Sequence, residues 1–568
     1  MEYNKPWFDH YPPEIPKSIV YDEKSLHDYL LASGKKHREK KALYFMGKEM
    51  TYGELLSEAK KMAKFFQEKG LKKGDRVAIM LPNCPQGVIT YYGALMAGGI
   101  VVQVNPLYTE RELAYQLKDS GASFIIGLDI LVPRISAVRE ETNLKHVIVT
   151  RIADYLPFPK NLVYPFIQKR QYNMVVKVEK SEDTHIWKDI INETPENYES
   201  VAIDPEEDLA LLQYTGGTTG KPKGVMLTHK NLVSNVQMVR AWMYKLEDGN
   251  ETVLAALPFF HVYGMTTVMN LSIMSAYRMV LLPKFDAEET LKTIEKLKPT
   301  IFPGAPTMYI GLLNHPKIEK YDLSSIQACI SGSASLPLDV QNKFEEITGG
   351  RLVEGYGLTE SSPVTHANLV WDKRINGSIG LPWPNTDAKI FKKGTLEEVA
   401  VGEVGEIAVK GPQVMKGYWN LEDETNETLK DGWLLTGDMG RMEEDGFFYV
   451  VDRKSDMIIA GGFNIYPREV EEVLFEHDGV QEASVVGIPD DYRGETVKAY
   501  IVPKEGMTLD EKQLDRYCRK NLAAYKIPRI YEFREELPKS IIGKVLKREL
   551  IEESIAEMEE KQKQDKIG

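Results

Sequence analysis

The sequence is poor in cysteine and has no excess of positive charge. Its 568 residues include only Cys84, Cys329 and Cys518, and their wide spacing and odd number exclude a disulfide framework and a zinc-binding spacing. Thiols without disulfides favour a reducing, cytoplasmic compartment. A formal net charge of −13 argues against a nucleic-acid partner, because nucleic-acid-binding proteins are usually basic. An anionic ligand must therefore be met by local positive charge.

Long hydrophobic runs are also missing. The longest apolar region, residues 265–283, is interrupted by Asn270, Ser272, Ser275 and Arg278. This composition favours a core helix and strand over a membrane span. Residues 1–18 lack the basic start and apolar run of a signal peptide.

The chain is too long for a single hydrophobic core, so two or more domains are expected. In the first part, helices are expected at residues 51–68 and 91–97, and strands at 75–81, 100–104, 124–127 and 146–149. Strands that alternate with helices predict layered α/β subdomains around a largely parallel sheet. From Gly402, short strands bounded by turns predict a small β-rich subdomain.

A smaller α+β domain is expected at the end of the chain. Its helices are expected at residues 470–475, 509–522 and 545–555, and its strands at 483–488 and 497–502. A charged stretch, residues 452–456, precedes this part. We place the boundary near Ser455, which gives an N-terminal domain of residues 1–454 and a C-terminal domain of residues 455–568.

Residues 214–225, Tyr-Thr-Gly-Gly-Thr-Thr-Gly-Lys-Pro-Lys-Gly-Val, are the most informative segment. Glycines let backbone N–H groups converge on one point, threonines add hydroxyl donors and lysines add positive charge, as a polyphosphate requires. The spacing differs from a Walker A loop, since three residues separate Gly216 from Gly220 and a proline follows Lys221. A surface turn is the structural alternative. The candidate phosphate-binding residues are Thr215, Gly216, Thr218, Thr219, Gly220 and Lys221.

The residues on both sides of this segment predict two strands and a helix. An apolar run, residues 209–212, reads as a buried strand before the loop, and a second short strand, residues 225–228, follows it. A helix then begins, with Thr228 or Asn231 as its N-cap.

The segment resembles the signature loop of the adenylate-forming superfamily, which includes acyl-CoA synthetases, aryl-CoA ligases, luciferases and peptide-synthetase adenylation domains. In that superfamily a Thr/Ser/Gly-rich loop ends in Gly-Lys-Pro-Lys-Gly. The resemblance extends over about residues 26–550, with further motifs in the family order. It implies a large AMP-binding and acyl-binding domain and a smaller, mobile C-terminal domain, with ATP, Mg²⁺ and coenzyme A as ligands.

The nucleotide site is implied by three further motifs. In Glu-Gly-Tyr-Gly-Leu-Thr-Glu, residues 354–360, the resemblance places Tyr356 and Gly357 at the adenine, Thr359 at a phosphate and Glu360 on magnesium. The small residues Ser333 and Ala334 would lie beside the adenine and the acyl carbonyl, although the family often has glycine at position 333. Asp438 would bind the ribose hydroxyls, and Arg453 would bind ribose and phosphate.

Further motifs correspond, by the same resemblance, to the sites for the acid substrate and for coenzyme A. His261, in Pro-Phe-Phe-His-Val-Tyr-Gly, resembles the residue near the acyl carboxylate, and Tyr263 would line the acid pocket. This motif lacks the Asp that binds an α-amino group, which favours an acid without an α-amine. Lys544 resembles the catalytic lysine of adenylation. Gly461, Gly462 and Phe463 resemble the loop that meets the pantetheine arm of coenzyme A, and Ser455 stands where the family commonly has Asp or Lys as its hinge.

These motifs together predict a bacterial-type fatty-acid–CoA ligase for long- or medium-chain acids. An aryl-acid (4-coumarate-like) CoA ligase, a non-catalytic nucleotide-binding regulator and a carrier-protein-loading domain are the alternatives. Residues 157–177 interleave aromatic with basic residues, which indicates either a solvated helix or a contact with the inner face of a membrane. A homodimer is also among the expected partners.

Overall fold

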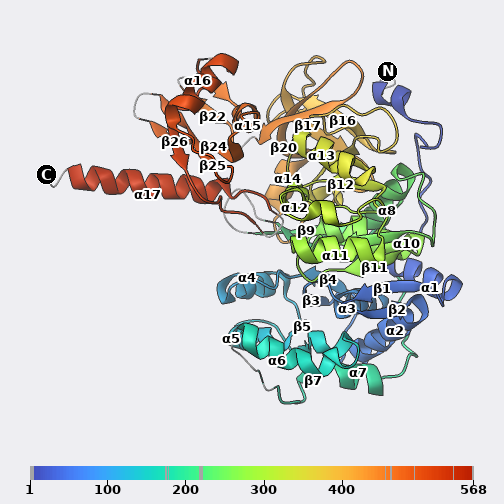
Figure 1. Cartoon of the computed structure of the whole chain (residues 1–568). Helices are drawn as coiled ribbons and strands as arrows, with labels where there is room; N and C mark the ends of the chain where they lie inside the picture. Colours follow the sequence, from blue (N-terminus) through green and yellow to red (C-terminus); the bar gives the residue numbers. More distant parts are fainter. Residues whose placement is uncertain are drawn as a thin grey trace.

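The structure is a computed structural model (Figure 1). It describes residues 5–172, 176, 178–215, 222–453, 456–460, 463–490, 493–522, 524–540 and 543–565. The expected boundary between residues 454 and 455 lies outside these residues.

An eight-stranded sheet organises the N-terminal part, in the order β18-β9-β8-β4-β3-β5-β6-β7. The strands from β8 to β7 run parallel, while β9 and β18 are antiparallel additions. The bounds are β3 (Arg76–Met80), β4 (Ile100–Gln103), β5 (Phe124–Leu128), β6 (His146–Thr150), β7 (Thr184–Ile186), β8 (Leu209–Thr215), β9 (Lys223–Thr228) and β18 (Gly417–Tyr418). Every residue of β4 and β5 is buried, because parallel strands are covered on both faces. The largely parallel sheet expected from the sequence is confirmed.

Two four-stranded sheets lie beside it, ordered β10-β11-β1-β2 and β12-β13-β14-β15. Their bounds are β1 (Lys41–Phe45), β2 (Lys48–Thr51), β10 (Thr252–Ala255), β11 (Arg278–Leu281), β12 (Ala328–Ser331), β13 (Arg351–Gly357), β14 (Val364–Ala367) and β15 (Leu381–Pro382). Ile301 forms a parallel bridge to Val253 of β10 and another to Ala328 of β12. Ile301 therefore helps to join the two sheets.

Helices cover these sheets. They include α1 (Leu26–Lys36), α2 (Tyr52–Glu68), α3 (Pro85–Met96), α4 (Glu110–Ser120), α5 (Val132–Arg139), α6 (Lys160–Tyr172), α7 (Trp187–Glu193), α8 (His229–Trp242), α9 (Val262–Gly264), α10 (Leu271–Ser275), α11 (Ala287–Leu297), α12 (Pro306–Leu313) and α13 (Leu338–Thr348). Helix α2 begins where predicted, because Thr51 and Glu54 form a capping box. Helix α3 begins earlier than predicted, at Pro85, since proline suits the first helical position.

The longest apolar region is part of the core. It forms a π-helical stretch (Met265–Asn270), α10 and β11, and almost all of its side chains are buried. This confirms the core interpretation. No helix among the described residues is both long and apolar enough to cross a bilayer.

The expected small β-rich subdomain is present after β15. It consists of β16 (Asp387–Phe391), β17 (Gly405–Lys410), β19 (Leu429–Lys430), β20 (Trp433–Met442) and β21 (Phe448–Arg453) in one antiparallel sheet, with α14 (Glu422–Thr428) beside it. Residues from Trp7 to Phe448 contribute to one continuous hydrophobic core.

The C-terminal part has separate cores between Ile458 and Leu550 (Figure 1). Its elements are β22 (Ile458–Ala460), β23 (Phe463–Ile465), α15 (Pro467–Phe475), β24 (Val480–Asp490), β25 (Gly494–Pro503), α16 (Glu511–Asn521), β26 (Ile530–Phe533) and α17 (Lys547–Asp565). The molecule thus has a large N-terminal and a smaller α+β C-terminal domain, as predicted. Helix α17 projects away from the body and is longer than the expected 545–555.

Candidate active site

The Gly/Thr/Lys motif connects two antiparallel strands. Thr215 is the last residue of β8, and it pairs with Lys223, the first residue of β9. Gly216, Thr218, Thr219, Gly220 and Lys221 lie outside the described residues. The two predicted strands and the helix that follows them are confirmed. Thr228 is the N-cap of α8, since its Oγ1 accepts a hydrogen bond from Asn231 N at 3.2 Å.

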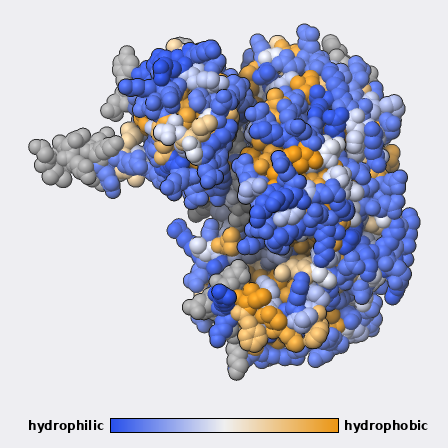
Figure 2. Space-filling model, in the orientation of Figure 1, coloured by the Kyte–Doolittle hydropathy of each residue, from blue (hydrophilic) through white to orange (hydrophobic). Residues whose placement is uncertain are grey.

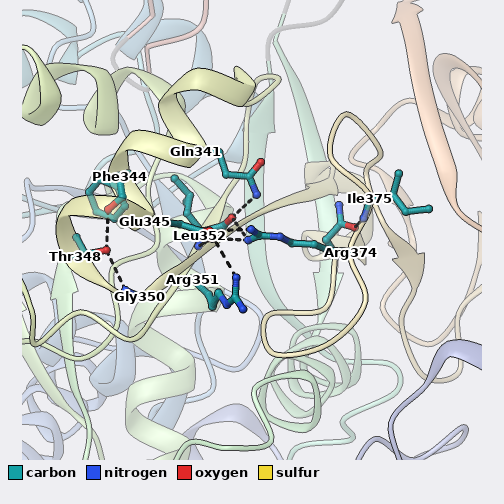
Figure 3. A network of polar contacts seen from close by, with 10 residues as sticks. Gln341, Phe344, Glu345, Thr348, Gly350, Arg351, Leu352, Arg374 and Ile375 are labelled. Carbon is teal, nitrogen blue, oxygen red and sulfur yellow. Dashed lines mark hydrogen bonds and ion pairs between the residues drawn. The ribbon is translucent and has the colours of Figure 1, made fainter.

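Strand β13, which carries residues 354–357, is anchored at its start by a polar network with α13 (Figure 3). Leu352 N donates to Glu345 Oε1 at 2.8 Å, and Arg374 Nη2 donates to Glu345 Oε2 at 2.7 Å. Gln341 Nε2 donates to Leu352 O at 2.7 Å. Burial alone would raise the pKa of Glu345, but Arg374 and the Leu352 N–H hold this pKa below its ordinary value. The network holds the start of β13 in place, and with it the path of the following residues 354–357.

Tyr356 and Asp438 meet at the far end of β13. Tyr356 Oη donates to Asp438 Oδ2 at 2.6 Å, although the two residues come from different sheets. Asp438 is buried and lies opposite Arg453 in the β20–β21 pair. The backbone of Gly357 lies close to Pro363 O, where no Cβ would fit. The structure therefore gathers an aromatic ring, a carboxylate and the Arg453 backbone at one place; the Arg453 side chain lies outside the described part of the chain.

Glu360 lies one short helical turn beyond Tyr356, in a 3₁₀ helix with Thr359, and both are half-buried. Tyr418 Oη donates to Glu360 Oε1 at 2.8 Å, and Met415 N donates to Glu360 O at 2.8 Å. The Lys223 ammonium lies 5.0 Å from the centre of the Tyr418 ring. The end of the phosphate-loop hairpin and Glu360 thus share Tyr418 as a neighbour.

A magnesium ion fits this arrangement only with help from phosphate oxygens. Among the described residues, no group of three His, Cys, Asp or Glu side chains could hold a metal. Magnesium is commonly bound by one or two carboxylates together with substrate phosphates and water. The half-buried carboxylate of Glu360, next to the phosphate-loop hairpin, suits that mode.

His261 caps the N-terminus of the short helix that leads into the core. Its Nδ1 accepts a hydrogen bond from Tyr263 N at 3.3 Å, and Tyr263 Oη donates to Ile330 O at 2.7 Å. The Tyr263 ring packs on Gly332, where an added Cβ would lie 3.1 Å from Cε1. The motif that contains His261 and Tyr263 is thereby packed against the segment of small residues that begins at Gly332.

Ser333 and Ala334 follow directly and are exposed. Ser333 has a φ of +73°, in the left-handed region that favours glycine. This explains why glycine is common at this position among proteins that the sequence resembles.

Lys544 comes from the C-terminal domain, yet it lies close to His261. Burial, together with a smaller effect of the Lys544 ammonium, lowers the pKa of His261 to about 4. Gly543 has a φ of +77° and packs so tightly on Thr307 of α12 that an added Cβ would overlap Thr307 Oγ1. Lys544 N donates to Ser540 Oγ at 3.2 Å, which closes the loop. Lys544 is thus near enough to His261, far away in the sequence, for its charge to act on the imidazole.

Arg468, at the start of α15, contacts both domains. Its backbone N donates to Asp452 Oδ2 at 2.8 Å, its Nη1 donates to Val450 O at 3.0 Å, and its Nη2 lies 3.8 Å from Glu354 Oε1. Glu354 is buried, which raises its pKa, while Arg468 opposes the rise. Gly461 and Gly462 lie outside the described residues. Phe463 begins β23, and only its backbone is described.

Sequence reasoning missed several residues of this site. Tyr418, Thr307 and Arg468 stand outside the quoted family motifs or have no assigned role in them, and each contacts a predicted site residue. No local sequence signal indicates them, because their importance arises from contacts between segments that are distant in the chain.

The fold and these contacts define an adenylate-forming enzyme with two domains. Residues 30–419 match the family of AMP-binding enzymes, and residues 469–544 match the AMP-binding enzyme C-terminal domain. The chain therefore belongs to the AMP-binding enzyme family. The second match ends at Lys544.

Curated relatives and solved structures agree. A long-chain-fatty-acid–CoA ligase of Bacillus subtilis is 56% identical over 554 residues, which are 97% of this chain and 99% of the relative. Another of Salmonella typhimurium is 41% identical over 98% of this chain and 100% of its own. The ATP-bound crystal structure of MatB from Rhodopseudomonas palustris has a TM-score of 0.82 at 29% identity, covering 93% of this chain and 98% of that chain.

Proposed function

We propose that the protein is a fatty-acid–CoA ligase that forms acyl-CoA, AMP and pyrophosphate. The observation that supports this function best is that the Lys544 loop of the C-terminal domain packs on Thr307 of the N-terminal domain, with the Lys544 charge acting on His261. Two relatives named long-chain-fatty-acid–CoA ligase, similar over nearly their full lengths, support a long-chain acid as the substrate.

In the first half-reaction, a carboxylate oxygen attacks the α-phosphorus of ATP. An O–P bond forms, the bond to the β-phosphate oxygen breaks, and pyrophosphate leaves. Positioning and charge neutralisation dominate such phosphoryl-type transfers. Lys544 offsets negative charge on the carboxylate and the α-phosphate. Thr215, with the loop residues Gly216, Thr218, Thr219, Gly220 and Lys221, binds the β- and γ-phosphates.

His261 orients the acid as a neutral group. With a pKa of about 4, its imidazole is uncharged near neutral pH. Because Nδ1 accepts the Tyr263 N–H, the ring proton is on Nε2, which can donate to the carboxylate of the acid. Tyr356, Gly357, Ser333 and Ala334 surround the adenine in this proposal.

The remaining nucleotide contacts are assigned by position. Asp438 and Arg453 hold the ribose, Thr359 contacts a phosphate, and Glu360 would hold magnesium. Magnesium, when bound, neutralises charge on the phosphates.

In the second half-reaction, the thiol of coenzyme A gives its proton to water, and its sulfur attacks the acyl carbonyl carbon. A C–S bond forms, the C–O bond to AMP breaks, and AMP leaves with that electron pair. Gly461, Gly462 and Phe463 are the residues that meet the pantetheine arm in this proposal. We also propose that residues 455–568 move as a unit between the two half-reactions, about a pivot near Ser455.

The test is the release of AMP and pyrophosphate with a panel of acids, with magnesium, ATP and coenzyme A present. We expect the highest kcat/KM for long-chain saturated acids. A preference for aryl acids would instead establish the 4-coumarate-like alternative. Failure to release AMP with every acid would leave only the regulator, which the proximity of Lys544 to His261 disfavours.

We further propose a cytoplasmic location with peripheral contact at the inner face of the membrane. The three cysteines are free thiols, and all are buried. The homodimer expected from the sequence stays a prediction, which the molar mass in solution tests.

A further inference from the structure

Helix α6 has its polar residues directed inward and its apolar residues directed outward. Gln168 is buried, and its Nε2 donates to both carboxylate oxygens of Asp129 at 3.1 Å. Asn161 and Tyr164, which share a helix face with Gln168, are half-buried. A surface helix of a globular protein normally has the opposite polarity, with its apolar stripe on the core. The inward face of α6 thus combines the Gln168–Asp129 hydrogen bonds with the packing of the Tyr164 ring on the hydrophobic core.

The outward face is a contiguous apolar surface, which we call the α6 surface. Phe158 is 79% exposed and Phe166 is 74% exposed, and at least half of each of the other side chains is exposed. The α6 surface consists of Phe158, Leu162, Val163, Phe166 and Ile167. In Figure 2 the lower part of the molecule, where Figure 1 places α6, shows a hydrophobic area. Large exposed apolar patches mark sites of interaction.

The segment that carries this surface has a charge opposite in sign to that of the whole protein. Residues 155–178 contain no Asp or Glu, although the chain has 84 acidic residues and a net charge of −13. The same segment contains Lys160, Lys169, Arg170 and Lys177. Lys169 and Arg170 are exposed in the last turn of α6, next to Phe166 and Ile167. An apolar face flanked by basic residues complements an anionic lipid surface.

We propose that the α6 surface docks the protein on an anionic phospholipid bilayer. Phe158 and Phe166 insert among the lipid headgroups, while Lys169 and Arg170 contact phosphate groups. The choice of a lipid surface over a protein partner rests on the proposed function, because long-chain fatty acids partition into bilayers. Docking places the enzyme where its substrate is concentrated.

Vesicle binding tests the docking without any catalytic step. The purified full-length protein is sedimented with vesicles of phosphatidylcholine, or of equal parts phosphatidylcholine and phosphatidylglycerol. We expect binding to the mixed vesicles, reduced by high salt, and at least about tenfold weaker binding to pure phosphatidylcholine.

Two variants separate the apolar from the charged contribution. The double variant Phe158→Ser with Phe166→Ser should lose at least about tenfold in binding to mixed vesicles. Lys169→Glu with Arg170→Glu should lose a similar factor. The matched control for charge is Lys35→Glu with Lys36→Glu, since these residues are also exposed in the last turn of a helix. The control for the apolar change is Val20→Ser, because Val20 is 94% exposed. Both controls should bind as the wild type does.

Several results would overturn the proposal. One is wild-type protein that stays in the supernatant with mixed vesicles, and another is serine variants that still bind. A wild-type dimer that the serine double variant converts to a monomer, without vesicle binding, would instead assign the α6 surface to a second copy of the chain. Activity on a medium-chain acid dissolved in buffer should be the same for all variants. That measurement tests the proposed function separately from docking.

Discussion

Lys544 makes the clearest prediction at the scale of single residues. Lys544→Ala removes the charge that lies near His261, so acid-dependent pyrophosphate release should fall by at least about a hundredfold. Thioester formation from supplied acyl-adenylate should be largely retained. Lys512→Ala, an exposed lysine of the same domain, is the control and should leave both rates unchanged. Equal loss of both half-reactions would contradict a role restricted to adenylation.

Gly543 next to it should tolerate no side chain. In Gly543→Ala the new Cβ would overlap Thr307 Oγ1, and the positive φ would be strained. We expect the loop to leave its place on α12, so that adenylation falls about as far as in Lys544→Ala. Adding Thr307→Gly to Gly543→Ala should restore part of the activity by removing the overlap. No recovery would mean that the backbone conformation alone is decisive.

Tyr418 should act as a positioning residue for Glu360. Tyr418→Phe removes the hydroxyl that donates to Glu360 Oε1 at 2.8 Å, without changing the size of the ring. We expect a higher magnesium requirement and roughly a fivefold increase in the KM for ATP, with a smaller change in kcat. An unchanged magnesium titration would count against this role.

The sequence predicts these three residues to different degrees. Lys544 is indicated by its motif and by the order of the motifs. Gly543 belongs to the same motif, but the need for glycine depends on Thr307, which is more than two hundred residues away. Tyr418 carries no local signal at all. Chemistry that resides in a contiguous motif can be predicted from sequence, whereas a contact between distant segments requires the fold.

Arg468 makes a prediction at the scale of elements, because it connects α15 to β13 and β21. Arg468→Ala removes hydrogen bonds to Val450 O and Glu472, and leaves the buried Glu354 without its nearby cation. We expect adenylation to slow roughly tenfold, since the domain arrangement that brings Lys544 to His261 is less populated. The rate of thioester formation should change less.

The control for Arg468 is Arg548→Ala. Arg548 forms an exposed pair with Glu552 on one face of α17, and such pairs contribute little. Introducing Glu354→Gln into the Arg468→Ala chain should recover part of the lost activity, because an uncharged residue no longer needs the guanidinium. Identical slowing of both half-reactions would show that Arg468 acts only on overall stability.

Element boundaries differ from prediction mainly where a cap or a proline decides them. The start of α2 could be predicted because Thr51 and Glu54 form a recognisable capping box. Helices α3 and α15 begin at Pro85 and Pro467, earlier than the apolar pattern indicates, because proline suits the first turn. Hydrophobic periodicity predicts the middle of a helix more accurately than the residues at which the helix begins and ends.

Buried histidines make a prediction about the whole molecule. Burial lowers the pKa to about 3 for His229 and His366, and to about 4 for His185. Each folded-state pKa lies below the ordinary value, so the unfolded chain binds more protons between about pH 3 and 6.5. The stability that these histidines contribute is complete above about pH 6.5 and is lost as the pH falls. Near pH 5 the loss should be on the order of 2 kcal/mol each for His229 and His366.

His229→Asn checks this dependence. His229 Nδ1 accepts the Leu26 N–H at 3.1 Å, and an Asn side-chain oxygen can accept the same bond without titrating. The difference in the free energy of unfolding between pH 7 and pH 5 should be smaller in the variant than in the wild type, as measured by denaturant unfolding. A difference as large as that of the wild type would assign the acid sensitivity to other groups.

At this scale the sequence predicts the architecture well. The alternation of strands and helices indicates the parallel sheet. The short strands bounded by turns after Gly402 indicate the β-rich subdomain. The connection between the sheets could not be predicted, since Ile301 takes part through isolated bridges that a strand pattern does not reveal.

Residues 300–304 run between β10 and β12 and are bridged to both strands, each of which leads toward proposed site residues. β10 leads to His261, β12 leads to Ser333, and the chain itself continues to Thr307, on which the Lys544 loop packs. A shift of this short connector would therefore displace His261, Ser333 and Thr307 together. Divergence among related ligases should therefore retain this spacing and change acid preference through the side chains that line the pocket.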